Sequence, residues 1–541
     1  MAHAAERQSG DAIAPQWHAP APAARAATMA LYAWRDPRTS MLIALGAALP
    51  AVIAALIAPA LLTVSQTADL LAPIAEARAM ASGAAPVAAV SSPFYLSLLL
   101  AADFFFEAPG RIHLGAKAIA ALLAALAFAS VAAARVSAAQ AAVLTACLAA
   151  FVAAPFSGPA EASLALLMAV TASFICAPAD NISRRAAVEG ALAGAILVAL
   201  WMSDAVLALF GVIALSACPF LSGGRGLIRY GCALAMACGL VALGEALLPG
   251  VSAARALSVS QTLASAFSTT GHARVFDSAA LAVGCVLVIF IGFVFGGREH
   301  RRNAGAAIGF VFIAWAGARI AGADAAIVFV FAAGIAVFST ASPFYDGVFR
   351  AHDRASIAVS GAAGLLALTL GLAVIAQSAE QFVRQARAAG VAPAAIREAF
   401  AIVQEPEPTL ARWIDEGRFA SAEARALFPL APADQSAMLL AAGERMRAFG
   451  AEGLEVSILT RGDIACVIAG RRDCSTDGKA AAARAKIVLV PRFDLDAGGG
   501  AFRGKSEALL YTEFRRVEQT AQWDVWVRRG TNLQTPFGTA Q

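Results

Sequence analysis

The sequence predicts a polytopic α-helical membrane protein with a C-terminal extramembrane domain of α/β or α+β type. Of its 541 residues, 60% are hydrophobic and only 14% are charged, whereas soluble globular domains have about 25% charged residues. Apolar runs of roughly 17 to 25 residues, the length of a helix that crosses a bilayer, recur between residues 41 and 377. Beyond residue 379 charged residues become frequent and the long apolar runs end.

About eleven of these apolar runs are predicted to be transmembrane helices. They cover residues 41–63, 113–134, 138–155, 161–178, 186–202, 204–221, 228–248, 278–296, 304–321, 325–341 and 356–377. Residues 93–106 are apolar but too short to cross a bilayer, so we expect a helix lying in the membrane surface. Residues 1–40 are polar and rich in Ala and Pro, which predicts a disordered cytoplasmic tail before the transmembrane domain of residues 41–378.

The distribution of arginines predicts the orientation of the spans. Basic residues gather in alternate connections between spans: Arg135; Arg184 and Arg185; Arg225 and Arg229; Arg298, Arg301 and Arg302; Arg350 and Arg354. Cytoplasmic loops carry such an excess of Lys and Arg. The pattern therefore predicts a multi-pass protein of the bacterial inner membrane, with segments 64–112 and 249–277 outside and residues 379–541 forming a periplasmic domain.

The C-terminal domain is predicted to be helical over residues 379–449 and then to contain short strands. The expected strands lie within residues 455–462, 464–470, 486–493, 508–519 and 523–529. Cys466 and Cys474 fall among them. In an oxidising periplasm they could form a disulfide; two unrelated thiols are the alternative.

The segment after the first apolar run, TADLLAPIAEARAMASG (residues 67–83), carries charge where charge is scarce. Asp69, Arg78, Met80 and Gly83 are spaced as in the first external loop of the GT-C superfamily of membrane glycosyltransferases. The segment most resembles the dolichyl-phosphate-mannose protein mannosyltransferases and the bacterial aminoarabinose transferases. Ser92-Pro93-Phe94-Tyr95 and Arg111 match the interfacial helix and the mouth of the second span.

The resemblance covers residues 41–222 in detail, including the Arg184-Arg185 pair and the small-residue run AVEGALAGAILVAL. Three departures from the family pattern stand out. Leu70 replaces its second acidic residue, and Trp201-Met202-Ser203-Asp204 replaces a lysine. Tyr345 matches a family tyrosine without its lysine, and the predicted topology puts Tyr345 on the cytoplasmic side.

The resemblance implies transfer of a sugar from a polyprenyl-phosphate donor to a lipid, glycan or protein acceptor at the periplasmic membrane face. A carboxylate suits the base that takes the acceptor proton, and Asp69 is the candidate. Arginine binds phosphate through two parallel hydrogen bonds, so Arg78 and Arg111, with His113, are candidate substrate-binding residues. Asp103 is a further candidate, for acceptor binding or, with Asp69, for a divalent metal ion; no cofactor is certain.

Several candidates also have a purely structural interpretation. Asp69 could be a solvated loop aspartate, Asp103 could face lipid headgroups, and Arg111 could anchor a helix end by snorkelling. In the external segment 258–278, His272 and Arg274 lie close to Asp277 and form either a binding loop for the acceptor or phosphate or a structural loop.

Two other functions compete with glycosyl transfer. A transporter or flippase usually carries ionisable residues at the bilayer midplane, where this chain is almost all apolar. A non-catalytic membrane scaffold on the same fold is favoured by the loss of the second acidic residue, because fold does not fix function. The expected partners are the polyprenyl-phosphate donor and membrane lipids, without nucleic acid, and the sequence does not indicate an oligomeric state.

Overall fold

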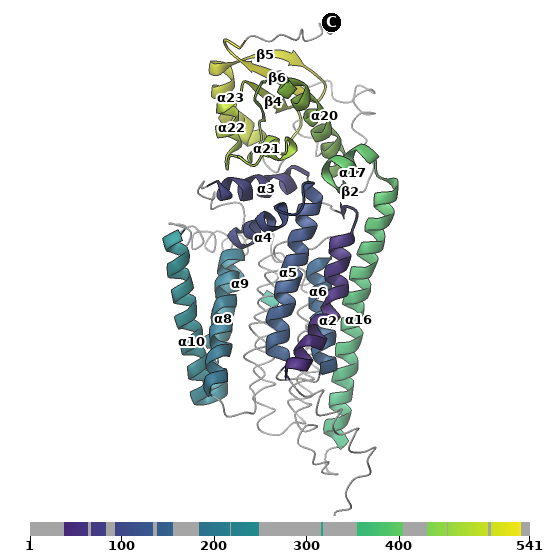
Figure 1. Ribbon diagram of the computed structural model, residues 1–541, viewed down its shortest axis with the longest axis vertical. Coiled ribbons are helices and arrows are strands. Elements are labelled where there is room, and N and C mark those ends of the chain that lie inside the picture. The colour runs from purple at the N-terminus through teal and green to yellow at the C-terminus, as the bar shows by residue number, and fades with distance from the viewer. Residues whose placement is uncertain are drawn as a thin grey trace, which may run out of the picture.

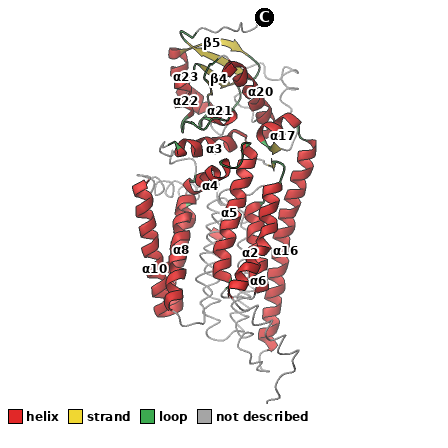
Figure 2. Ribbon diagram, in the orientation of Figure 1, coloured by secondary structure: helices red, strands yellow, loops and turns green. Residues whose placement is uncertain are grey.

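The computed structural model is mostly helical, with a small sheet near the C-terminus (Figures 1 and 2). It describes residues 37–62, 67–82, 92–133, 138–154, 183–216, 218–247, 315–316, 354–403, 430–451, 453–495 and 499–531. Four predicted spans, 161–178, 278–296, 304–321 and 325–341, lie wholly or almost wholly outside these residues. The predicted tail before residue 37 lies outside them too.

Within the described ranges, four helices are long and apolar enough to cross a membrane. They are α2 (Pro37–Ile57), α5 (Pro109–Ala132), α8 (Ser183–Ser203) and α10 (Cys218–Leu247). The predicted spans 138–155 and 356–377 correspond to α6 (Ala138–Ala153) and α16 (Arg354–Val391). Helix α16 continues past residue 379, so the predicted domain boundary falls inside a helix.

The predicted span 204–221 and the loop after it differ from the structure. Helix α9 (Ala205–Ser216) has 12 residues, about 18 Å at 1.5 Å per residue, and α10 begins two residues later. Arg229, predicted in a cytoplasmic loop, is instead buried in α10 with its Nη2 atom 3.1 Å from Oε2 of Glu189 on α8. Burial requires such a partner, because an isolated buried charge is costly.

Glycines explain why α8 and α10 pack so closely. A Cβ atom at Gly190 or Gly194 would collide with the backbone carbonyl oxygen of Arg229 or Ala233 on α10. Small residues four apart on one helix face let two helix backbones touch. The small-residue run identified in the sequence is therefore a helix-packing surface.

Two short helices lie across one end of the long helices, below the C-terminal domain (Figure 1). They are α3 (Thr67–Ala81) and α4 (Pro93–Asp103). Ser92 caps the N-terminus of α4, where its hydroxyl accepts a hydrogen bond from the Tyr95 N–H, and Pro93 occupies the first turn. Both features are typical of helix N-termini. Helix α4 corresponds to the short helix that the sequence predicts within residues 93–106.

The C-terminal domain is a small α/β unit with a four-stranded mixed sheet in the order β3-β4-β6-β5. The strands are β3 (Val456–Ile458), β4 (Ile487–Pro491), β5 (Phe514–Gln519) and β6 (Trp523–Arg528). Only β3 and β4 are parallel. The helices are α17 (Ala394–Phe400), α20 (Pro432–Ala451), α21 (Ile464–Ile468), α22 (Gly478–Arg484) and α23 (Gly499–Glu513).

One strand prediction, residues 464–470, was wrong, and another, residues 508–519, was wrong in part. Residues 464–468, predicted as a strand, form α21, because Asp463 caps the helix by accepting a hydrogen bond from the Cys466 N–H. Residues 508–513, predicted to begin a strand, belong to α23, and the strand starts at Phe514. Short apolar runs do not distinguish a strand from a buried helix by pattern alone.

A second, two-stranded sheet joins the long helices to the C-terminal domain. Strand β1 (Leu61–Leu62), just after α2, pairs in parallel with β2 (Ile402–Val403), just after α17. The Leu61 N–H also donates to the Ala401 carbonyl at 2.7 Å. All four strand residues are buried, so this sheet fixes the domain to the end of α2.

Candidate functional site at the junction of the helices and the C-terminal domain

Helix α3 is the centre of the candidate site, because α4 contacts it on one side and α20 and α21 of the C-terminal domain contact it on the other. Asp69 lies in its first turn and Arg78 in its last, an arrangement that the helix dipole favours. Leu71, Ile74 and Ala75 are fully buried. The segment predicted to belong to an external loop thus forms a helix that lies between α4 and the C-terminal domain.

Arg78 connects three parts of the chain. Its Nη2 and Nε atoms donate to the two carboxylate oxygens of Asp103, at the end of α4, with distances of 2.6 and 3.0 Å. Its Nη1 atom donates to the backbone carbonyl of Arg471 in the C-terminal domain at 2.8 Å. The side chains of Arg78 and Asp103 are only 7% and 9% exposed. Both predicted substrate-binding residues thus hold each other in a buried pair.

Asp69 is exposed, although contacts with the C-terminal domain flank it on both sides. Before it, the Thr67 N–H donates to Oε1 of Gln435 at 3.1 Å, and the Thr67 hydroxyl lies 2.6 Å from that of Ser436. After it, Ala72 packs so closely on Gly462 that a Cβ atom at Gly462 would lie 3.0 Å from the Ala72 Cβ. The candidate base therefore lies at the edge of the seam between α3 and the C-terminal domain.

His113 is buried below α3. Its Nε2 atom lies 2.7 Å from the Leu70 carbonyl oxygen, and its Nδ1 atom lies 3.0 Å from the Tyr95 hydroxyl. A carbonyl can only accept, so Nε2 carries a hydrogen and donates it. Leu70, which stands where the resembled family has its second acid, thus contributes its backbone to the junction.

Arg111, at the start of α5, reaches the end of α2. Its Nη1 atom donates to the carbonyls of Leu56, at 3.2 Å, and Ala58. Its guanidinium carbon also lies 5.7 Å from the centre of the Phe106 ring, within the range of a cation–π contact. These contacts satisfy carbonyls that the end of α2 leaves without helical partners.

The other predicted site residues, His272, Arg274 and Tyr345, lie outside the described residues. Among the residues that the structure describes, no group of three or more His, Cys, Asp or Glu side chains could hold a metal ion. Asp103, one of the two candidate ligands, has its charge balanced by Arg78. A cation there would have to displace the guanidinium.

The loop that receives Arg78 is closed by a disulfide between Cys466 and Cys474, whose Cα atoms are 5.5 Å apart. This outcome confirms one of the two alternatives that the sequence left open. Asp463 reinforces the loop, because its two carboxylate oxygens accept hydrogen bonds from the backbone N–H groups of Cys466 and Ser475 at 3.3 and 3.1 Å. Burial raises the pKa of Asp463 above its usual 3.8, and these two bonds oppose that rise.

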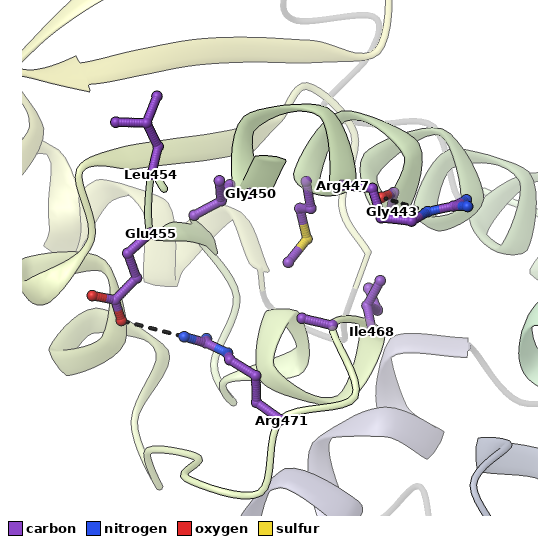
Figure 3. Close-up of a pocket in the computed structure, with 10 residues that line it drawn as sticks. Gly443, Arg447, Gly450, Leu454, Glu455, Ile468 and Arg471 are labelled. Carbon is purple, nitrogen blue, oxygen red and sulfur yellow. Dashed lines mark hydrogen bonds and ion pairs between the residues drawn. The ribbon is translucent and has the colours of Figure 1, made fainter. Parts of the chain in front are cut away.

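A pocket of about 270 Å³ lies on the C-terminal domain between α20, β3 and the disulfide loop (Figure 3). Met446, Leu454 and Ile468 give it apolar walls, and Glu455 and Arg471 form an ion pair of 3.3 Å at its edge. Arg471 is thus shared, since its side chain lines the pocket while its carbonyl accepts from Arg78.

Sequence reasoning missed the residues that the C-terminal domain contributes to the junction: Gln435, Ser436, Gly462, Asp463 and Arg471. Each lies more than 350 residues from its partner on α3 or within a local loop that no motif marks. The Asp-x-x-Cys spacing before α21 was the one available indication, as a helix cap.

No family model, no curated protein and no solved structure matches this chain.

Proposed function

We propose that the chain is a polytopic protein of the bacterial inner membrane, with about eleven spans and a periplasmic C-terminal domain. It transfers a sugar from a polyprenyl-phosphate donor to a lipid, glycan or protein acceptor at the periplasmic face. Asp69 acts as the base that takes the acceptor proton. The resemblance in residues 41–222 is the origin of this proposal.

One structural observation carries the proposal. Two short helices, α3 and α4, follow the first long helix and lie across the end of the long helices, and α3 exposes Asp69 in its first turn. A donor whose lipid tail stays in the bilayer brings its phosphate to this level. An exposed carboxylate there can meet an acceptor hydroxyl from the aqueous side, which general-base catalysis requires.

Mass spectrometry of envelope lipids and glycans tests the proposal in a deletion strain complemented with wild type, Asp69→Asn or Asp473→Asn. Asp473 is an exposed aspartate of the disulfide loop and serves as the matched control. We expect a sugar modification to disappear on deletion and to return with wild type and Asp473→Asn only. Full restoration by Asp69→Asn would exclude Asp69 as the base.

A non-catalytic membrane scaffold is the second candidate, and one observation favours it. Arg78 and Asp103 are committed to each other, and His113 contacts Leu70, the residue that replaces the family's second acid. On this proposal the junction holds the C-terminal domain in place for a partner. The Asp69→Asn strain separates the two functions, because a scaffold does not need the Asp69 carboxylate and is expected to complement the deletion fully with this variant.

A further inference from the structure

The phosphate of a polyprenyl-phosphate donor needs a cation, and the structure commits the two predicted arginines to other groups. Arg78 donates to both oxygens of Asp103 and to the Arg471 carbonyl. Arg111 donates to two carbonyls at the end of α2. Breaking the buried Arg78 pair to bind a ligand would leave Asp103 as a buried charge without compensation, which is costly.

The C-terminal domain brings another arginine to the level of Asp69. Gly462, in the turn after β3, packs against Ala72, three residues after Asp69 on α3. Residues three apart on a helix are neighbours on one face. Arg461 immediately precedes Gly462 and is exposed, as Asp69 is. The packing of Gly462 on α3 therefore puts a basic and an acidic residue from two parts of the chain at the same seam.

The seam is held firmly on both sides. Thr67 contacts Gln435 and Ser436 before Asp69, and the Gly462–Ala72 contact follows it. The turn that carries Arg461 is also fixed, because the Arg461 carbonyl accepts the Gly478 N–H at 2.9 Å and the Thr460 hydroxyl donates to the Gly462 carbonyl at 2.8 Å. These bonds fix the backbone position from which the Arg461 side chain extends, relative to α3.

We propose that Arg461 binds the donor phosphate, so that the site of transfer is shared between α3 and the turn after β3. This inference rests on the proposed function. In the transfer step, Asp69 takes the proton of the acceptor hydroxyl, whose oxygen forms a bond to the anomeric carbon. The bond from that carbon to the phosphate oxygen breaks, and Arg461 stabilises the negative charge that remains on the polyprenyl phosphate. The C-terminal domain thereby becomes part of the catalytic site.

The test compares two lipids that differ only in the head group, undecaprenyl phosphate and undecaprenol, bound to the full-length protein in nanodiscs. The measured quantity is the ratio of the two affinities. We expect wild type to prefer the phosphate, Arg461→Gln to lower that preference by about tenfold, and Arg461→Lys to retain part of it, since a hydrogen bond to a charged group has about that effect. Arg472→Gln, at an exposed arginine of the disulfide loop, is the matched control and keeps the wild-type ratio.

The outcomes separate this inference from the proposed function. If wild type prefers the phosphate and Arg461→Gln keeps that preference, the inference is overturned and the proposed function stands. If wild type does not distinguish the two lipids, both fall. A purely structural role for Arg461 would lower the melting temperature and leave the affinity ratio unchanged, and that result also overturns the inference.

Discussion

Arg78 and Asp103 form a two-pronged ion pair, with N–O distances of 2.6 and 3.0 Å, and this pair joins α3 to α4 at the point where the C-terminal domain docks. Both side chains are more than nine-tenths buried. A buried pair of this kind is costly to break from one side, because the remaining charge keeps its desolvation penalty and loses its partner.

Replacement of Arg78 by methionine is therefore expected to destabilise the protein by about 3–5 kcal/mol. The double variant Arg78→Met/Asp103→Leu should recover much of this loss, since it leaves no unpaired charge. Thermal and denaturant unfolding of the purified protein measures both effects.

Arg384 and Glu380, an ion pair of 2.8 Å on α16 with side chains 58% and 62% exposed, provide the control. Exposed pairs four residues apart on a helix contribute only about 0.3–0.5 kcal/mol, so Arg384→Ala should have little effect. Equal losses for Arg78→Met and Arg384→Ala would show that the Arg78 pair does not stabilise the junction.

Removal of the disulfide by Cys466→Ser/Cys474→Ser should cost about 2 kcal/mol, at the low end of the usual range because the closed loop is short. The loop carries the Arg471 carbonyl that accepts from Arg78, so hydrogen exchange should rise both in residues 466–474 and near Arg78. Cys238→Ser, at a cysteine without a disulfide, is the control. Exchange that rises in the loop alone would mean that the disulfide does not support the junction.

Asp463 should make stability depend on pH. Burial raises its pKa in the folded protein above the usual 3.8, so between these two pKa values the folded state binds more protons than the unfolded state. Stability from this group is then present at low pH and is lost as pH rises through the folded-state pKa.

The variant Asp463→Asn lacks this titration. It also loses one of the two acceptors for the Cys466 and Ser475 N–H groups. We expect the stability of wild type minus that of the variant to be largest in acid and to fall as pH rises. Melting temperatures of both proteins over that pH range measure the difference, and a constant difference would contradict the assignment.

The sequence predicted the elements whose pattern is local. Apolar runs of sufficient length gave α2, α5, α8 and α10, and short runs rich in β-branched or aromatic residues at 486–493 and 523–529 gave β4 and β6. A short helix was predicted over residues 93–106 because that apolar run is too short to cross a bilayer, and α4 occupies Pro93–Asp103. Helix α21 was missed because IACVI suits a strand as well as a helix, and the deciding feature is the cap from Asp463.

The candidate site was predictable only as a set of residues. Arg78, Asp103 and His113 were identified, but their partners depend on how the C-terminal domain docks. The Arg78 guanidinium meets a carbonyl 393 residues away, and the Thr67 amide meets a side chain 368 residues away. Contacts at such separation leave no periodicity or spacing in a single sequence, so a substrate-binding arginine and a structural one look alike.

Gly110 lies at a close contact between the long helices and the C-terminal domain, so a substitution there tests how the domain is fixed. A Cβ atom at Gly110, in the first turn of α5, would collide with the carbonyl oxygen of Ala401. Ala401 has little freedom to move, because it is held in the left-handed region with φ 49° and its carbonyl accepts the Leu61 N–H at 2.7 Å.

Gly110→Ala should therefore cost about 1–3 kcal/mol, as overpacking does, and should speed hydrogen exchange of Leu61 and Val403 by opening the β1–β2 sheet. Gly390→Ala is the matched control, since Gly390 is exposed on α16 and a Cβ atom there would meet nothing within 4 Å. That substitution should be neutral or stabilising by up to about 1 kcal/mol, because alanine favours helix. If Gly110→Ala is as stable as wild type and hydrogen exchange in β1 and β2 is unchanged, α5 does not pack tightly against this sheet. The C-terminal domain would then be fixed mainly through α3.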